Sequence, residues 1–331
     1  MPTQSDFTLR SFMEKINSEE NFTGKICRVD IRYDEPMADH TTFKVGGKAD
    51  VWVKPDKEVF PDFAAKLLVS AKAEGIPVFI LGAGANIVVS DKGIRGIVLD
   101  TGAYSGMEIK EKPFAKAERW TFTFMANVLS GTPVDSLVDD LAGQRLLGME
   151  FLAGMPGSVG GAVWMNARCY EKSVSDALME TTILDENSER QTVPFRAADF
   201  SYKKSPFQGR ECLILSACFA LRSGESEEIL EEVESHRRDR VEKGHYRFPS
   251  AGSAFKNNRD FGESTGKIID ELGLRGLSVG GAQIAPWHGN IIINTGGATA
   301  SDIRALIDEV TLRVKEERGL DLESEILFVG E

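Results

Sequence analysis

The segment Ile76–Asp91 constrains the fold most, because a predicted buried strand at 76–81 runs directly into Gly82-Ala83-Gly84-Ala85-Asn86. Glycines allow the backbone N–H groups of such a turn to approach a phosphate closely. A Rossmann dinucleotide site would need a third glycine and a following helix, whereas Ile87-Val88-Val89 is β-branched and predicts a strand. The segment therefore predicts a strand–turn–strand unit, which by itself fits either a phosphate loop or a plain tight hairpin.

Two further glycine-marked turns flank this loop in the sequence. Thr41-Thr42-Phe43-Lys44-Val45-Gly46-Gly47 precedes it, and Met155–Ala167 (MPGSVGGAVWMNA) follows it. Three such turns in one domain offer several backbone donors to one elongated ligand that carries a pyrophosphate. A purely structural explanation would need three coincidences, so the turns together favour binding of such a ligand.

With these motifs, the chain resembles the UDP-N-acetylenolpyruvoylglucosamine reductase family. The matching segments are TTFKVGG, LGAGANIVVSD, GMEFLAGMPGSVGGAVWMNA, SAGSAFKN, LSVGGAQIAPWHGNIIINTGGATASDI and LESEILFVGE. They follow one another in the family's order over roughly residues 31–331, and this collinearity is more specific than any single glycine motif. The stretch between Tyr202 and Ser253 is similar to the short-loop form of the family.

The resemblance implies an α+β fold with two domains. A two-lobed FAD-binding domain of the vanillyl-alcohol-oxidase (PCMH) type is expected at 31–222, after an N-terminal extension at 1–30. A smaller α/β domain that binds the substrate is expected at 223–331. The polar and charged stretch Arg222–Glu228 is the predicted boundary.

The resemblance also implies the ligands: non-covalent FAD, NADPH as co-substrate, and a UDP-sugar as substrate. The residues that match FAD-binding positions of the family are Thr42, Gly46, Gly82, Ala83, Gly84, Ala85, Asn86, Gly157, Ser158, Gly160, Gly161 and Asn166. The residues that match its nucleotide-sugar positions are Tyr202, Lys243 and Asn257.

In this family, hydride passes from the flavin to the vinyl carbon of an enolpyruvyl ether, and the neighbouring carbon is then protonated. Such chemistry requires an acid near that carbon and a cation near the substrate carboxylate. Ser253 matches the family's proton donor, and Glu325 matches its catalytic glutamate. The apolar neighbours of Glu325 predict a buried strand at 322–329, where a carboxyl group favours its neutral, proton-donating form.

The cation is where the chain departs from the pattern. The family has Tyr-Arg-x-Ser, and this chain has Tyr202-Lys203-Lys204-Ser205, so Lys203 is predicted to be the catalytic cation. Lysine keeps the charge but lacks the planar fork that binds a carboxylate with two parallel bonds. In an extended segment, Lys204 would point to the opposite side. Arg168 and Glu171 also stand where the family usually has glycine, and Arg168 is an alternative source of a guanidinium.

Two other functions stay open. Many flavin oxidases of this fold attach FAD covalently through a histidine beside the phosphate loop, whereas this loop has Asn86 and no histidine. A UDP-sugar-binding flavoprotein with weakened catalysis is the second alternative, and Lys203 motivates it. NADPH consumption that depends on the enolpyruvyl substrate distinguishes the reductase from both.

Composition excludes several other classes. A net charge of −12 disfavours binding to nucleic acid. Four cysteines without a CxxC pair predict free thiols in a reducing compartment, and four scattered histidines predict no metal site. The polar N-terminal segment and strand-sized apolar stretches predict neither a signal peptide nor a membrane span. We therefore expect a cytoplasmic protein, with a monomer favoured.

Apolar periodicity predicts the main elements. Helices are expected at 57–74, at 226–243, near 266–272, and from Ser301, as its N-cap, to Arg318. A further helix is expected to open with Thr132 as N-cap and Pro133 as its first residue. Strands are expected at 76–81, 212–221, 278–285, 290–294 and 322–329.

Overall fold

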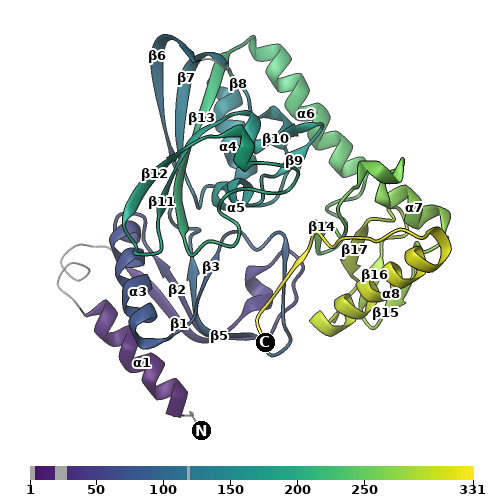
Figure 1. Ribbon diagram of the computed structural model, residues 1–331, viewed down its shortest axis with the longest axis horizontal. Coiled ribbons are helices and arrows are strands. Elements are labelled where there is room, and N and C mark those ends of the chain that lie inside the picture. Colours follow the sequence, from purple (N-terminus) through teal and green to yellow (C-terminus); the bar gives the residue numbers. More distant parts are fainter. Residues whose placement is uncertain (1–3, 19–27, 118–119) are drawn as a thin grey trace. The chain divides into compact units, whose positions relative to one another are not determined.

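The computed structural model describes residues 4–18, 28–117 and 120–331, and the chain forms two compact units (Figure 1). Unit 1 contains the described residues up to Arg32, Val51–Ala83 and Gly96–Arg237. Unit 2 contains Tyr33–Asp50, Gly84–Arg95 and Arg238–Glu331. Each unit is thus assembled from three separate stretches of the chain. The functional division at residues 31, 222 and 223 stays a prediction.

The first sheet has the strand order β1-β2-β5-β3. Its strands are β1 (Val29–Pro36), β2 (Lys48–Pro55), β5 (Ile94–Asp100) and β3 (Val78–Leu81). Helix α3 (Phe60–Glu74) buries a stripe of Phe60, Phe63, Ala64, Leu67 and Ala71, and it ends at Gly75 in the left-handed conformation. The predicted helix is confirmed, although it begins three residues later than expected.

The described part of the N-terminal extension contains helix α1 (Gln4–Asn17). This helix buries Leu9, Phe12, Met13 and Ile16. This i, i+3, i+4, i+7 spacing places the four side chains on one face of the helix. Lys15 pairs with Glu74 at the end of α3, with 3.7 Å between Nζ and Oε1.

The second sheet lies in unit 1 and is antiparallel in the order β12-β11-β13-β7-β6, with β8 also pairing with β13. Its strands are β6 (Met107–Ala117), β7 (Trp120–Leu129), β8 (Leu146–Leu147), β11 (Leu178–Leu184), β12 (Arg190–Pro194) and β13 (Leu213–Ser223). The strand β13 is buried on both faces from Leu213 to Leu221, as its apolar run predicted.

Unit 1 also contains helices α4 (Val134–Gly143) and α5 (Val159–Trp164) and the short pair β9 (Arg168–Cys169) and β10 (Lys172–Ser173). Helix α6 (Ser226–Glu242) begins in unit 1 and continues into unit 2 from Arg238. The predicted cap of α4 was wrong by one position, because Pro133 is the N-cap. The Thr132 hydroxyl accepts the N–H of Gly106 at 2.9 Å instead. A hydroxyl with a tertiary partner is no longer available to cap its own helix.

Unit 2 contains an antiparallel sheet in the order β14-β17-β16-β15 and a parallel pair, β4 with β18. The strands are β14 (Ser250–Ser253), β15 (Ser278–Val279), β16 (Ala282–Ile284), β17 (Ile291–Asn294), β4 (Ile87–Val89) and β18 (Leu327–Val329). The predicted strand at 278–285 is a hairpin, because Gly280 has a φ of +53° and reverses the chain. The predicted strand at 322–329 is also shorter than expected, with only an isolated bridge from Ser324 to Phe255 before β18.

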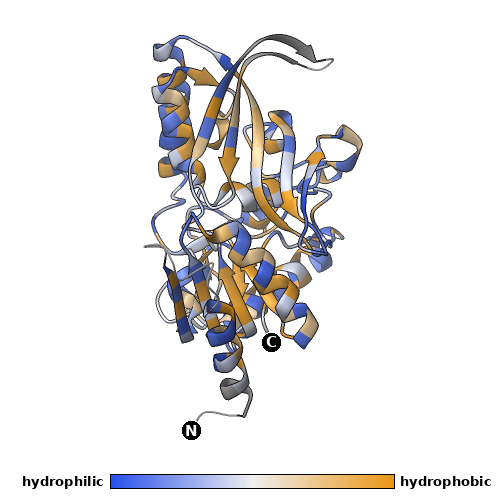
Figure 2. Ribbon diagram, turned by 90° about the vertical axis from the view of Figure 1, so that its left-hand side faces the viewer, coloured by the Kyte–Doolittle hydropathy of each residue, from blue (hydrophilic) through white to orange (hydrophobic). Residues whose placement is uncertain are grey.

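Helices α7 (Thr265–Glu271) and α8 (Ala300–Arg318) complete unit 2. Figure 2 shows polar and apolar residues alternating along the helices, and α8 buries Ile303, Leu306, Ile307, Val310 and Val314 on its apolar face. The predicted cap Ser301 is wrong: Thr299 is the N-cap, and the Ser301 hydroxyl donates to Asp91 at 2.6 Å.

No helix among the described residues is both long enough and apolar enough to cross a bilayer. Cys169, Cys212 and Cys218 are free thiols, as predicted. Cys27 lies outside the described residues.

Candidate functional site

The glycine loop between β3 and β4 keeps its own backbone donors unused. None of the five N–H groups from Gly82 to Asn86 donates a hydrogen bond to another described residue. Gly84 has a φ of +62°, and a Cβ atom there would lie 2.1 Å from the carbonyl oxygen of His40. Consecutive N–H groups around a left-handed residue form a concave site for an anion. β4 pairs with β18 and not with β3, so the loop is not a plain hairpin.

In unit 1, the glycine-marked turn at Met155–Ala167 approaches the start of this loop. A Cβ atom on Gly82 would lie 2.5 Å from Oγ of Ser158. Ser158 is buried and caps α5, accepting the N–H of Gly161 at 3.4 Å. Gly157 has a φ of +138° and open space where its Cβ atom would be. Both segments therefore present backbone atoms, with little side-chain bulk, to a ligand.

Thr42 and Gly46, from the first glycine-marked turn, pack against other segments of unit 2. The Thr42 hydroxyl donates to the carbonyl of Ser250 at 2.7 Å. Gly46 has a φ of +136°, and a Cβ atom there would lie 2.7 Å from Cβ of Val89. Both residues are thus explained by packing inside unit 2, and their contact with FAD stays a prediction.

Unit 2 brings Ser253 and Glu325 close together. Ser253 ends β14, and the carbonyl of the next residue, Ala254, accepts the N–H of Glu325 at 2.8 Å. Glu325 is 9% exposed, although it lies on an irregular segment and not on the strand that the sequence predicted. The carbonyl of Glu325 accepts a hydrogen bond from Nδ2 of Asn86 at 3.0 Å. A hydroxyl and a buried carboxyl are therefore held by adjacent backbone.

Glu323 differs from Glu325 in its environment. Its side chain is 70% exposed and pairs with Lys256, with 2.5 Å between Nζ and Oε1. An exposed carboxylate with a cationic partner is a surface group. Of the two acids in this segment, Glu325 is thus the buried one, and its catalytic role stays a prediction.

Asn290 is a site residue that the sequence prediction missed. Its side chain is buried and binds both backbone groups of Phe255: Oδ1 accepts the N–H at 2.8 Å, and Nδ2 donates to the carbonyl at 2.8 Å. Its own carbonyl accepts the N–H of Ala254 at 2.8 Å. The two bonds of the buried amide and the one bond of the backbone carbonyl together fix the chain just after Ser253. The available signal was an amide directly before the apolar run Ile291–Ile293.

The segment that carries Lys203 is a turn, so the extended conformation assumed from the sequence is wrong. Ser201 and Lys204 form an isolated bridge, and Lys203 has a φ of +56°. Gln208 donates to the carbonyl of Lys203 at 3.1 Å. Lys203 is half-buried and Lys204 is exposed, so the two lysines still lie in different environments.

Asn166 holds this turn in unit 1. It is 3% exposed, its Nδ2 donates to the carbonyl of Ser201 at 2.8 Å, and its Oδ1 accepts the N–H of Ser175 at 3.1 Å. The amide is thus a support for the segment that carries Tyr202 and Lys203. Its contact with FAD stays a prediction.

The predicted nucleotide-sugar residues of unit 2 lie at the end of α6 and after β14. Lys243 is half exposed and its Nζ lies 2.7 Å from Oδ2 of Asp239, while Oδ1 of Asn257 accepts the N–H of Thr265 at 2.9 Å. Burial, together with the charge of Arg240, lowers the pKa of the nearby His245 to about 4. His245 is therefore a neutral ring at physiological pH, whereas Lys243 is one of the cations of this segment.

Arg168 is bound within its own loop. Its guanidinium donates to Oε2 of Glu171 at 2.7 Å and to the hydroxyl of Ser173 at 3.2 Å. Glu171 has a φ of +63°, which explains why glycine suits this position in the family. The ion pair from Arg168 holds the strained residue in place, which gives Arg168 a structural role.

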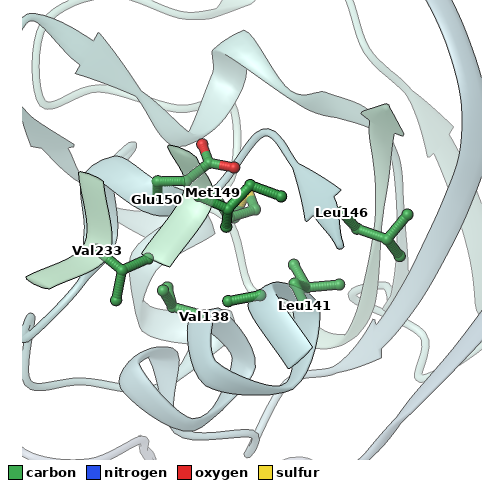
Figure 3. Close-up of a pocket in the computed structure, with 8 residues that line it drawn as sticks. Val138, Leu141, Leu146, Met149, Glu150 and Val233 are labelled. Carbon is green, nitrogen blue, oxygen red and sulfur yellow. The ribbon is translucent and has the colours of Figure 1, made fainter. Parts of the chain in front are cut away.

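An apolar cavity in unit 1 is lined by α4, α6 and the turn after β8 (Figure 3). Val138, Leu141, Leu146, Met149 and Val233 surround it, and it is too small to hold a water molecule. Burial raises the pKa of the adjacent Glu150, despite a hydrogen bond from the N–H of Gly148 at 2.7 Å. This cavity is part of the core and is not a ligand site.

Comparison with known proteins places this geometry in context. Residues 61–193 match the model of an FAD binding domain, and residues 244–329 match the UDP-N-acetylenolpyruvoylglucosamine reductase C-terminal domain. The reductase of Treponema denticola is 39% identical over 91% of this chain and 94% of its own length. That of Borreliella burgdorferi is 36% identical over 98% of each chain.

A solved structure agrees with the sequence relatives. The UDP-N-acetylenolpyruvylglucosamine reductase of Thermus caldophilus superposes with a TM-score of 0.71 at 30% identity, covering 92% of this chain and 99% of that one. The predicted α+β fold, with an FAD-binding domain and a C-terminal domain, is confirmed. On sequence identity, coverage and structure together, the chain belongs to the UDP-N-acetylenolpyruvoylglucosamine reductase family.

Proposed function

We propose that this chain is an FAD-dependent oxidoreductase that uses NADPH to reduce UDP-N-acetylglucosamine enolpyruvate to UDP-N-acetylmuramate in peptidoglycan precursor synthesis. The observation that carries the proposal is that Glu325 lies on backbone adjacent to Ser253, because its N–H donates to the next residue, Ala254, at 2.8 Å. A proton donor and a buried acid on adjacent backbone are what protonation of a carbanion requires.

The residues present fit the pyrophosphate of FAD. The five N–H groups of Gly82–Asn86, which have no hydrogen-bond acceptor among the described residues, are donors for phosphate oxygens. Ser158 lies so close to Gly82 that a side chain at position 82 would not fit. Bound FAD supplies hydride transfer from NADPH to the vinyl carbon of the enolpyruvyl ether. The loop holds Asn86 where covalent flavoproteins of this fold have a histidine, so we propose non-covalent binding.

This chain's own residues would complete the reduction. The hydroxyl of Ser253 donates a proton to the carbon beside the new C–H bond, so that hydride and proton together saturate the double bond. Glu325, as a buried acid, stabilises the charge that develops on the substrate carboxylate by hydrogen bonding. Lys203, half-buried in its turn, is the cation that binds this carboxylate. Tyr202, Lys243 and Asn257 are proposed to bind the UDP-sugar.

Anaerobic half-reactions test the proposal. NADPH should reduce the bound flavin, and UDP-N-acetylglucosamine enolpyruvate, added afterwards, should reoxidise it with formation of UDP-N-acetylmuramate. Reoxidation by oxygen alone would instead indicate a flavin oxidase. Binding of the UDP-sugar without reoxidation would indicate the weakened flavoprotein that Lys203 suggests. We further propose that the protein acts in the cytoplasm as a monomer, which fractionation and light scattering check.

A further inference from the structure

We propose that Asn86 is a positioning residue for Glu325, an inference that rests on the proposed function. Asn86 is the last residue of the glycine loop, and its side chain donates from Nδ2 to the carbonyl of Glu325 at 3.0 Å. Both residues lie in unit 2, although they are 239 positions apart in the sequence. The amide thus connects the loop proposed for FAD to the acid proposed to stabilise the charge that develops on the substrate carboxylate.

The backbone around Glu325 lies outside a regular strand, and Asn86 is one of the residues that hold it. The segment has an isolated bridge at Ser324, and β18 begins only at Leu327. Asn86 contacts the segment between Ser324 and β18 twice. Its side chain donates to the carbonyl of Glu325, and its own carbonyl accepts the N–H of Leu327 at 3.1 Å. On the other side of the segment, the N–H of Glu325 donates to the carbonyl of Ala254 at 2.8 Å, and the carbonyl of Glu323 accepts the N–H of Lys256 at 2.9 Å.

These bonds form one continuous chain that reaches the residue after Ser253. Asn86 binds Glu325, Glu325 binds Ala254, and Ala254 binds the carbonyl of Asn290. Each bond lies between 2.8 and 3.0 Å. Because buried Asn290 fixes the Ser253 end with three bonds to Ala254 and Phe255, loss of the Asn86 bond should allow Glu325 to move relative to Ser253.

The side chain and the backbone of Asn86 therefore have different tasks. Its backbone N–H donates to no described residue and stays available to an anion. Its side chain is bound to Glu325. Substitution of the side chain should consequently disturb proton transfer more than cofactor binding, which is the opposite of what a simple FAD contact predicts.

The test uses full-length protein with bound FAD, as wild type and as Asn86→Ala, Asn86→Asp and Thr299→Ala. The control Thr299 caps α8 in the same unit, and none of its hydrogen bonds among the described residues involves Glu325. Stopped-flow absorbance measures flavin reduction by NADPH and, separately, flavin reoxidation by UDP-N-acetylglucosamine enolpyruvate. Titration of the apoprotein with FAD and thermal unfolding report on cofactor affinity and folding.

For Asn86→Ala, reoxidation should slow about ten- to hundredfold, the scale of a small misplacement of a catalytic group. Flavin reduction and FAD affinity should stay close to the wild-type values, and Thr299→Ala should lose only stability. Asn86→Asp has nearly the same shape, but its ionised carboxylate cannot donate a hydrogen bond to Glu325. Its reoxidation rate should recover as acid protonates the aspartate, whereas that of Asn86→Ala should not.

Two results overturn the inference while leaving the proposed function intact. One is a normal reoxidation rate in both Asn86 variants. The other is an effect on the cofactor alone, which would assign Asn86 to FAD binding. It would appear as equal slowing of both half-reactions, or as loss of FAD with normal turnover of the protein that keeps its flavin. A wild-type protein that the substrate does not reoxidise would overturn the proposed function, and this inference with it.

Discussion

Replacement of Lys203 by methionine should slow reoxidation of the reduced flavin by the enolpyruvyl substrate. Lys203 is half-buried in a turn whose backbone is held by Gln208 and Asn166. The position of its charge is therefore restricted, whereas the neighbouring Lys204 is exposed. A hydrogen bond to a charged group contributes about 1.5–3 kcal/mol, and each 1.36 kcal/mol is a factor of ten in rate. The expected loss is therefore about 10- to 150-fold.

The matched control is Lys204→Met, because Lys204 is the next residue but is exposed. It should leave the rate nearly unchanged. Lys203→Arg should preserve or raise the rate, since only arginine offers two parallel donors to a carboxylate. Stopped-flow reoxidation and steady-state turnover of all three variants give the comparison. A harmless Lys203→Met, or a damaging Lys204→Met, would refute the assignment and require a different cation.

Four other expectations follow from the same structure. The purified protein should be yellow, and denaturation should release all of its FAD; colourless protein that takes up no flavin would contradict the cofactor assignment. Ser253→Ala should slow reoxidation about 10²–10⁴-fold with near-normal reduction by NADPH, whereas equal loss in both half-reactions would contradict its role as proton donor. Asp91→Asn should cost about 1 kcal/mol of unfolding free energy. Burial raises the pKa of Asp91, but the hydrogen bonds from Ser301 and Ala300 together outweigh it and lower this pKa. The stability difference, measured by urea unfolding, should therefore be present above the unfolded pKa of 3.8 and shrink as pH falls through the folded value. His245→Gln should reduce the acid sensitivity of unfolding between pH 6.5 and about 4, because burial and Arg240 lower the pKa of His245 to about 4, and the wild type loses stability as pH falls through this window; unchanged acid sensitivity would show that His245 is accessible.

The sequence predicted those elements whose signal is local. The stripe of α3 and the apolar run of β13 decide their own structure, because side-chain period alone places them. The caps were misassigned at Thr132 and Ser301, since each hydroxyl finds a partner distant in sequence, Gly106 and Asp91. The sequence around each cap contains no signal of its distant partner.

Site residues divide in the same way. Ser253 and Glu325 stand in recognisable motifs, and the structure places them on adjacent backbone; their catalytic roles stay predictions. Asn290 could not be predicted, because its importance lies in three bonds to residues about 35 positions earlier. Glu325 was expected on a strand, whereas its segment is irregular because only β18 itself pairs with β4.

The discontinuous makeup of unit 2 has a consequence for how the protein folds. Its core includes Phe43, Val45 and Val88 beside residues from the last third of the chain. Strand β4 can form its parallel pair only after β18 has been synthesised. Contacts this distant carry a large loop-closure cost and form late. During synthesis, unit 1 can begin to fold while the ribosome still holds the partner strand of β4. We therefore expect refolding in two phases, and a fragment that starts at Arg238 to aggregate for lack of its three apolar partners.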